Sequence, residues 1–216
     1  MNAAAPRVVV LGSGVGSNFE ALAEQAAGRY CIVAVGSDRP AALILNRARE
    51  RGISTFVLRP ADYSDRAGHD AALAAALAAA EPDWIALAGY LRFLGAETLA
   101  RWPGRILNVH PSLLPAFPGL DTHRRALAAG ARRHGATVHF VTTALDAGPR
   151  IVQARLGINP AETPESLRCR VHALEHRIYP RALTWCAAGR MRMEAEAAWF
   201  DGAPLREPVV IEENDP

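Results

Sequence analysis

Short apolar segments alternate with segments of helical periodicity over residues 7–88 of this chain. The apolar segments have the length and β-branched content of buried strands, and the helical ones end at glycine or before proline. The expected strands are residues 7–11, 31–35, 53–58 and 84–88, and the expected helices are 18–27, 43–51 and 65–81. This alternation predicts right-handed βαβ units in an open, mostly parallel sheet.

The pattern changes after a further strand that ends near His110. A short helix is expected at 122–129, and two long strands at 137–143 and 150–156 are close enough to pair antiparallel. Thr163, Pro164 and Ser166 open a last helix that ends near residue 188. We therefore predict a single-domain α/β fold, a Rossmann-like three-layer sandwich with a mixed, mostly parallel sheet. The domain is expected over 1–205, with halves of about 1–100 and 101–205, and 206–216 as a loosely ordered tail.

Composition excludes several classes of protein. The net charge of +2 and the lack of a long basic run argue against nucleic acid as a partner. Three scattered cysteines (Cys31, Cys169 and Cys186) do not form a disulfide framework and favour a reducing compartment. No segment has the pattern of a signal peptide or a membrane span. We therefore expect a cytoplasmic protein with no nucleic-acid or membrane partner.

Asn108 and His110 lie in the segment Leu107-Asn108-Val109-His110-Pro111, at the expected end of a strand. Alternate strand residues share one face, and Pro111 ends the strand because it has no N–H to donate. An amide can stabilise an oxyanion, and an imidazole can move a proton near neutral pH. The alternative is that Asn108 caps the strand and His110 is a packed or exposed loop residue.

A glycine-rich turn, Gly12-Ser13-Gly14-Val15-Gly16-Ser17-Asn18, joins the first expected strand to the first helix. Backbone N–H groups at such a turn bind phosphate. The spacing is G-x-G-x-G, not the G-x-G-x-x-G of dinucleotide sites, because Ser17 replaces the third glycine. A ligand with a single phosphate is favoured over a dinucleotide, and a purely structural turn stays open.

Asp146 lies in Leu145-Asp146-Ala147-Gly148, between the two long strands. Its carboxylate could pair with His110 and keep the imidazole charged, or it could simply suit the turn.

His172 and His176, four residues apart in the last helix, could bind zinc with a third ligand. The helix lacks the His-Glu-x-x-His pattern, so we expect no metal.

These motifs together resemble the phosphoribosylglycinamide formyltransferases, a family of folate-dependent enzymes of purine synthesis. The matching segments are 16–18 (GSN), 88–92 (AGYLR), 107–115 (LNVHPSLLP), 134–141 (HGATVHFV), 145–149 (LDAGP) and 197–202 (AAWFDG). Three residues depart from the family pattern: Asp121 where histidine is frequent, Thr143 where an acid is usual, and Ala147 where glycine is common.

The resemblance implies a role for each matching residue. Asn108, His110 and Asp146 would be catalytic. Glycinamide ribonucleotide would be bound by Gly16, Ser17, Asn18, His172, Ala173, Leu174 and Glu175. The co-substrate 10-formyltetrahydrofolate would be bound by Arg66, Leu91, Arg92, Phe93, Leu94, Asn108, Thr142, Thr143, Ala144, Leu145 and Asp146.

The implied reaction is transfer of a formyl group from the folate to the glycinamide amine. A formyltetrahydrofolate hydrolase usually has an extra N-terminal domain, and a methionyl-tRNA formyltransferase would need a further C-terminal domain and more positive charge. A non-catalytic nucleotide-binding module would need the glycine turn alone, and it would leave the Asn108, His110 and Asp146 motifs unexplained.

Overall fold

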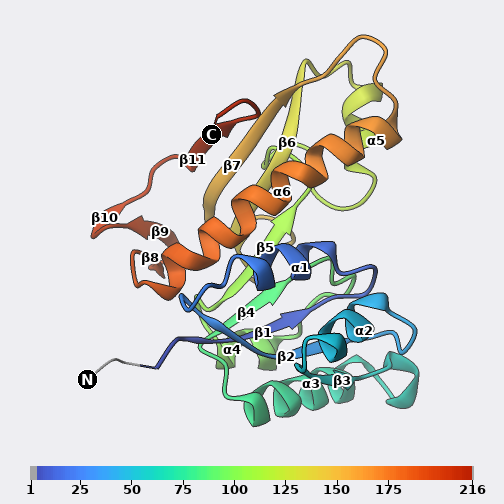
Figure 1. The fold of residues 1–216 in the computed structure, drawn as a ribbon, viewed down its shortest axis with the longest axis vertical. Helices are drawn as coiled ribbons and strands as arrows, with labels where there is room; N and C mark the ends of the chain where they lie inside the picture. Colours follow the sequence, from blue (N-terminus) through green and yellow to red (C-terminus); the bar gives the residue numbers. More distant parts are fainter. Residues whose placement is uncertain (1–3, 216) are drawn as a thin grey trace. The chain divides into compact units, whose positions relative to one another are not determined.

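A computed structural model of the protein describes residues 4–215 (Figure 1), and the chain divides between Leu107 and Asn108 into two compact units. The first unit contains β1 (Arg7–Leu11), α1 (Ser17–Glu24), β2 (Cys31–Ser37), α2 (Leu43–Glu50), β3 (Ser54–Val57), the 3-10 turn η1 (Pro60–Asp62), α3 (Arg66–Ala80), β4 (Trp84–Leu87) and α4 (Ala96–Arg101). Strand β5 (Ile106–His110) runs across the division.

The strands of the first unit pair in parallel, as the βαβ alternation predicts. β1 lies between β2 and β4, and β3 pairs with β2, which gives the order β4-β1-β2-β3. Residues 8–11 of β1 are fully buried, as expected for a central strand with helices on its faces. The carboxyl ends of these strands carry the glycine turn after β1 and the segment after β4.

Helix α4 was not predicted from the sequence. It begins after Gly95, and its first turn is held by the Asp70 carboxylate, which accepts hydrogen bonds from Gly95 N, Thr98 N and the Thr98 hydroxyl. A Cβ at position 95 would lie 2.2 Å from that carboxylate, so the contact requires glycine. The cap comes from α3, distant in sequence, and this is why a local pattern did not reveal it.

The second unit contains α5 (Thr122–Ala128), β6 (Arg133–Phe140), β7 (Arg150–Gly157), α6 (Pro164–Ala187), β8 (Met191–Glu194), β9 (Ala197–Phe200), β10 (Ala203–Pro204) and β11 (Val209–Glu212). β6 and β7 are antiparallel, as predicted, but β6 starts and ends earlier than the expected 137–143. α6 packs along β6 and β7 (Figure 1), and Thr163 and Ser166 form its capping box.

Part of the expected loose tail is a strand instead. Val209–Glu212 forms β11, which pairs in parallel with β7 at the edge of the sheet. Arg170 of α6 also binds the Glu213 carboxylate, with a shortest N–O distance of 2.7 Å. The prolines and acidic residues suggested a loose segment, but the consecutive β-branched residues of 209–211 (VVI) favour a strand. β8, β9 and β10 form a separate antiparallel sheet that the sequence analysis did not identify.

The fold is therefore of the α/β class, with mostly parallel strand pairs and the antiparallel pair β6–β7. This agrees with the predicted class. Within residues 4–215, no helix has both the length and the apolar character needed to cross a membrane.

Gly135 of β6 gives a direct test of strand packing. A Cβ there would lie 1.9 Å from the Ala154 carbonyl oxygen of β7, whereas a Cβ at Gly157 of β7 would meet nothing within 4 Å. We expect Gly135→Ala to lower the free energy of unfolding by about 3 kcal/mol, because the strands must separate to admit the methyl group. Gly157→Ala is the control. Urea denaturation of both variants makes the comparison, and equal stabilities would contradict the packing described.

Candidate active site

Asn108 and His110 lie at the end of β5, where the sequence places them. Pro111 follows directly, and His110 is buried although it is polar. A buried imidazole needs partners for both ring nitrogens.

Asp146 supplies one of these partners. It lies in the connection between β6 and β7 in the left-handed conformation, with φ of +49°. Its Oδ2 is 3.4 Å from His110 Nδ1 and also accepts a hydrogen bond from Gly119 N at 2.8 Å. The turn also requires Gly148, because a Cβ there would lie 1.9 Å from the Phe140 carbonyl oxygen. The structure thus brings together the Asp146 carboxylate and the His110 ring, which the sequence alone could only suggest.

The Phe117 carbonyl is the partner of the other ring nitrogen. His110 Nε2 lies 3.0 Å from the Phe117 oxygen, which can only accept a hydrogen bond. Carboxylate and carbonyl oxygens both act as acceptors for a ring N–H. The His110 ring therefore has an acceptor oxygen beside each of its nitrogens, with the Asp146 carboxylate at Nδ1.

His139 joins this cluster, although the sequence analysis named no catalytic or binding role for it. Its Nε2 lies 3.1 Å from Asn108 Nδ2 and 3.8 Å from Asp146 Oδ1, and its Nδ1 lies 2.9 Å from the Phe140 carbonyl oxygen. Burial lowers the pKa of His139 to about 4, against smaller opposing effects of the Phe140 carbonyl and Asp146. His139 is therefore neutral near pH 7. The sequence did contain one signal that could have identified His139: it is a polar residue on the inward face of the expected strand 137–143.

A buried polar network holds the loop that follows His110. The Thr137 hydroxyl donates to the Ser112 carbonyl at 2.7 Å and accepts from Leu114 N at 3.1 Å. Gln153 of β7 donates to the Leu114 carbonyl at 2.7 Å, and Arg150 donates to the same oxygen at 2.9 Å. The loop is thereby fixed to both long strands. Gln153 was not identified from the sequence, because its role depends on the pairing of β6 with β7.

The glycine turn of the first unit has the geometry of an anion site. Gly16 is the N-cap of α1 with φ of +85°, and a Cβ there would lie within 2.8 Å of three Ile44 atoms. Ser17 and Asn18 form the first turn of α1, where backbone N–H groups point along the helix axis and favour a negative charge. Asn18 is buried. These are features of the phosphate cradle that the sequence predicts.

Arg92 of the segment after β4 is held in place by Asp38. Arg92 Nε donates to Asp38 Oδ2 at 3.0 Å, and the Asp38 side chain is fully buried. Although burial opposes it, hydrogen bonds from Ser13 and Arg92 lower the pKa of Asp38, so the carboxylate stays ionised. Leu91 N donates to the Ser13 hydroxyl at 2.9 Å. The segment from 91 onward is therefore attached to the glycine turn.

Apolar side chains are exposed beside these groups in the first unit. Leu91 is 56 % exposed and Phe93 is 62 % exposed, whereas Leu94 is buried. Arg66 lies over the Phe93 ring, with its guanidinium carbon 5.6 Å from the ring centre. An exposed aromatic ring, a leucine and two arginines suit a flat, aromatic ligand that also carries carboxylates.

In the second unit, residues 142–145 precede Asp146 in the β6–β7 connection. Thr142 and Thr143 are half-buried or exposed, and Leu145 is 51 % exposed. Ala147 N bonds the Ala144 carbonyl at 3.4 Å, which closes the turn. Asp146, not Ala147, takes the left-handed conformation, so alanine is accommodated where glycine is common.

The polar residues of α6 do not form a metal centre. His172 Nε2 is 3.9 Å from the buried Glu175, and the His172 and His176 rings are 4.4 Å apart. In the described part of the chain, no group of three or more His, Cys, Asp and Glu side chains is arranged to hold a metal ion.

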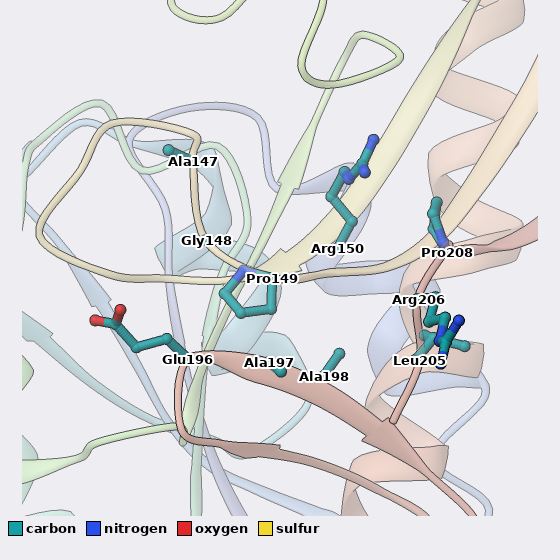
Figure 2. Close-up of a pocket in the computed structure, with 10 residues that line it drawn as sticks. All are labelled: Ala147, Gly148, Pro149, Arg150, Glu196, Ala197, Ala198, Leu205, Arg206 and Pro208. Carbon is teal, nitrogen blue, oxygen red and sulfur yellow. The ribbon is translucent and has the colours of Figure 1, made fainter. Parts of the chain in front are cut away.

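A pocket of about 260 Å³ lies on the side of the turn that follows Asp146 (Figure 2). Its lining residues are Ala147, Gly148, Pro149, Arg150, Glu196, Ala197, Ala198, Leu205, Arg206 and Pro208. Figure 2 shows that the Arg150 and Glu196 side chains extend in different directions, and Arg150 is already bonded to the Leu114 carbonyl. We assign this pocket no part in the chemistry.

His123 and His134 form a second histidine pair. His134 Nε2 lies 3.2 Å from His123 Nδ1, and the His134 ring is buried against Phe117. Burial lowers the pKa of His134 to about 4, helped by the nearby His123 and His110, and burial also lowers the pKa of His123. Asp121, just before this pair, takes the left-handed conformation with φ of +56°, which aspartate tolerates.

Comparison with known proteins identifies relatives over most of the chain. A family model described as formyl transferase matches residues 6–183. The phosphoribosylglycinamide formyltransferase of Escherichia coli (strain K12) is 41 % identical over 201 residues, which cover 92 % of this chain and 95 % of the relative.

Solved structures show the same similarity. The phosphoribosylglycinamide formyltransferase of Coxiella burnetii is 43 % identical with a TM-score of 0.91, over 96 % of this chain and 99 % of that chain. Glycinamide ribonucleotide transformylase 1 of Symbiobacterium toebii is 44 % identical with a TM-score of 0.88, over 92 % and 95 % of the two chains.

The His134 environment predicts a pH dependence of stability. The folded protein resists protonation of His134 until about pH 4, whereas the unfolded chain takes up that proton near pH 6.5. Stability is therefore full above about pH 6.5 and falls as the pH drops towards 4. We expect His134→Gln to show a weaker pH dependence across this window in urea unfolding. An unchanged dependence would show that His134 is not the source.

Proposed function

Because this chain belongs to the formyl transferase family, we propose that it transfers the formyl group of 10-formyltetrahydrofolate to the amine of N1-(5-phospho-β-D-ribosyl)glycinamide, in purine (IMP) synthesis. The observation that carries this proposal is the contact between the Asp146 carboxylate and His110, 3.4 Å apart, beside Asn108 in the same unit. A cluster of amide, imidazole and carboxylate suits acyl transfer to an amine.

The reaction begins when the free glycinamide amine attacks the formyl carbon. A C–N bond forms, and negative charge develops on the formyl oxygen. Asn108 Nδ2 and His110 Nε2 donate hydrogen bonds to that oxygen, and loss of one such donor typically costs roughly 10²–10³ in turnover. The bond between the formyl carbon and the folate nitrogen then breaks. The proton lost by the amine moves to that nitrogen, with Asp146 and water as the relay.

His110 donates to the substrate through Nε2, because Asp146 holds Nδ1. In the free protein the Phe117 carbonyl occupies Nε2. Substrate binding therefore exchanges one acceptor for another at the same N–H, and the segment around Phe117 moves away from the ring when the formyl oxygen arrives.

The two substrates take the residues named from the sequence. Gly16, Ser17 and Asn18 hold the 5′-phosphate at the start of α1, and the resemblance assigns the segment His172 to Glu175 of α6 to the ribonucleotide as well. The resemblance assigns Arg66, the segment Leu91 to Leu94 and the turn Thr142 to Asp146 to the folate. The folate is a co-substrate and no metal takes part. We further propose a cytoplasmic location and a monomer or homodimer.

A formyltetrahydrofolate hydrolase is the main alternative, since the same catalytic groups could activate water. The test is an assay of folate product with both substrates present and with each omitted in turn. We expect tetrahydrofolate and formylated glycinamide ribonucleotide to form in equal amounts, and neither to form when one substrate is missing. Turnover of the folate with water alone would indicate the hydrolase. Tight binding of the ribonucleotide without turnover would indicate a binding module.

A further inference from the structure

An oxyanion donor must present hydrogen rather than oxygen to the reacting group. The side chain of Asn108 can meet this requirement in one of its two orientations, because rotating the amide by 180° exchanges its N–H₂ and its C=O. In the wrong orientation the amide oxygen would face the developing negative charge and oppose the reaction. Something in the protein has to select the orientation.

The neighbouring His139 has the geometry to make this selection. Its Nδ1 lies 2.9 Å from the Phe140 carbonyl oxygen, an acceptor, so the proton of the ring is on Nδ1. The remaining nitrogen, Nε2, then has a lone pair and can only accept. Nε2 lies 3.1 Å from Asn108 Nδ2. The Phe140 carbonyl thus fixes the tautomer of His139, and the tautomer determines which end of the amide can face it.

The reverse orientation is disfavoured by burial. It would place the Asn108 oxygen against His139 Nε2, which would then need a second proton on a ring that is 2 % exposed. Asp146 Oδ1, 3.8 Å from Nε2, favours that proton, but the cost of burying the charge and the nearby His110 outweigh it and keep the ring neutral near pH 7.

We infer that His139 is a positioning residue that fixes the Asn108 amide with its nitrogen towards the ring, which leaves the second N–H of Nδ2 for the formyl oxygen. This inference rests on the proposed function for its catalytic consequence. The orientation itself is a property of the free protein and can be measured without any reaction.

Two variants separate acceptor loss from simple loss of packing. His139→Leu fills the site without an acceptor, whereas His139→Gln offers an N–H to the Phe140 carbonyl and an oxygen to Asn108. We expect kcat of His139→Leu to fall roughly 10- to 100-fold, less than the roughly 10²–10³ for outright loss of a donor, with both KM values within about twofold. His139→Gln should recover much of the loss.

A double-mutant cycle shows whether His139 acts through Asn108. In the Asn108→Ala background the amide is gone, so His139→Leu should have little further effect on kcat. If the losses of kcat in the two single variants multiply in the double variant, the inference is wrong. It is also wrong if kcat of His139→Leu alone is unchanged.

Nitrogen-15 NMR of the unmodified protein provides the readout that does not depend on activity. We expect His139 to carry its proton on Nδ1 at neutral pH, and a scalar coupling across the hydrogen bond between Asn108 Nδ2 and His139 Nε2. A proton on Nε2 would overturn the inference even if the enzyme is active. If the protein shows no transfer with the two substrates, the proposed function fails, and the NMR result still decides the orientation.

Discussion

The Asp146 carboxylate is the group on which the rest of the site depends. One of its oxygens faces both the His110 ring and the Gly119 N–H, and the other faces His139. A buried carboxylate is stable only when such partners surround it. The β6–β7 turn, the loop after His110 and the end of β5 are therefore linked by one side chain.

Much of the fold could be predicted because its signals are local. The apolar runs of β1, β2 and β4, and the helices ended by glycine or proline, follow from periodicity and backbone chemistry. The elements that were missed depend on distant contacts. α4 needs the Asp70 cap, and β11 needs the edge of β7. The expected loose tail was wrong at Val209–Glu212 for the same reason.

The residues of the candidate site also fall into two groups, those with a local signal in the sequence and those that depend on distant contacts. Asn108, His110 and Asp146 were identified from residue type and spacing, and the glycine turn from its place between a strand and a helix. Three other residues were given no catalytic or binding role: Asp38, His139 and Gln153. Their functions arise from hydrogen bonds between segments far apart in sequence, and the pattern of a single sequence does not reveal such bonds. Side-chain partners, unlike strand periodicity, are set by tertiary structure.

The variant Asp146→Asn tests the central role of this carboxylate most directly. Asparagine can still accept from Gly119 N–H, so the fold should persist, but it removes the charge beside His110. The account predicts an unchanged thermal midpoint, similar KM values and a kcat lower by roughly 10²–10⁴. Asp201→Asn is the matched control, because Asp201 is also left-handed, with φ of +49°, but exposed. A folded Asp146→Asn protein with full turnover would contradict the account.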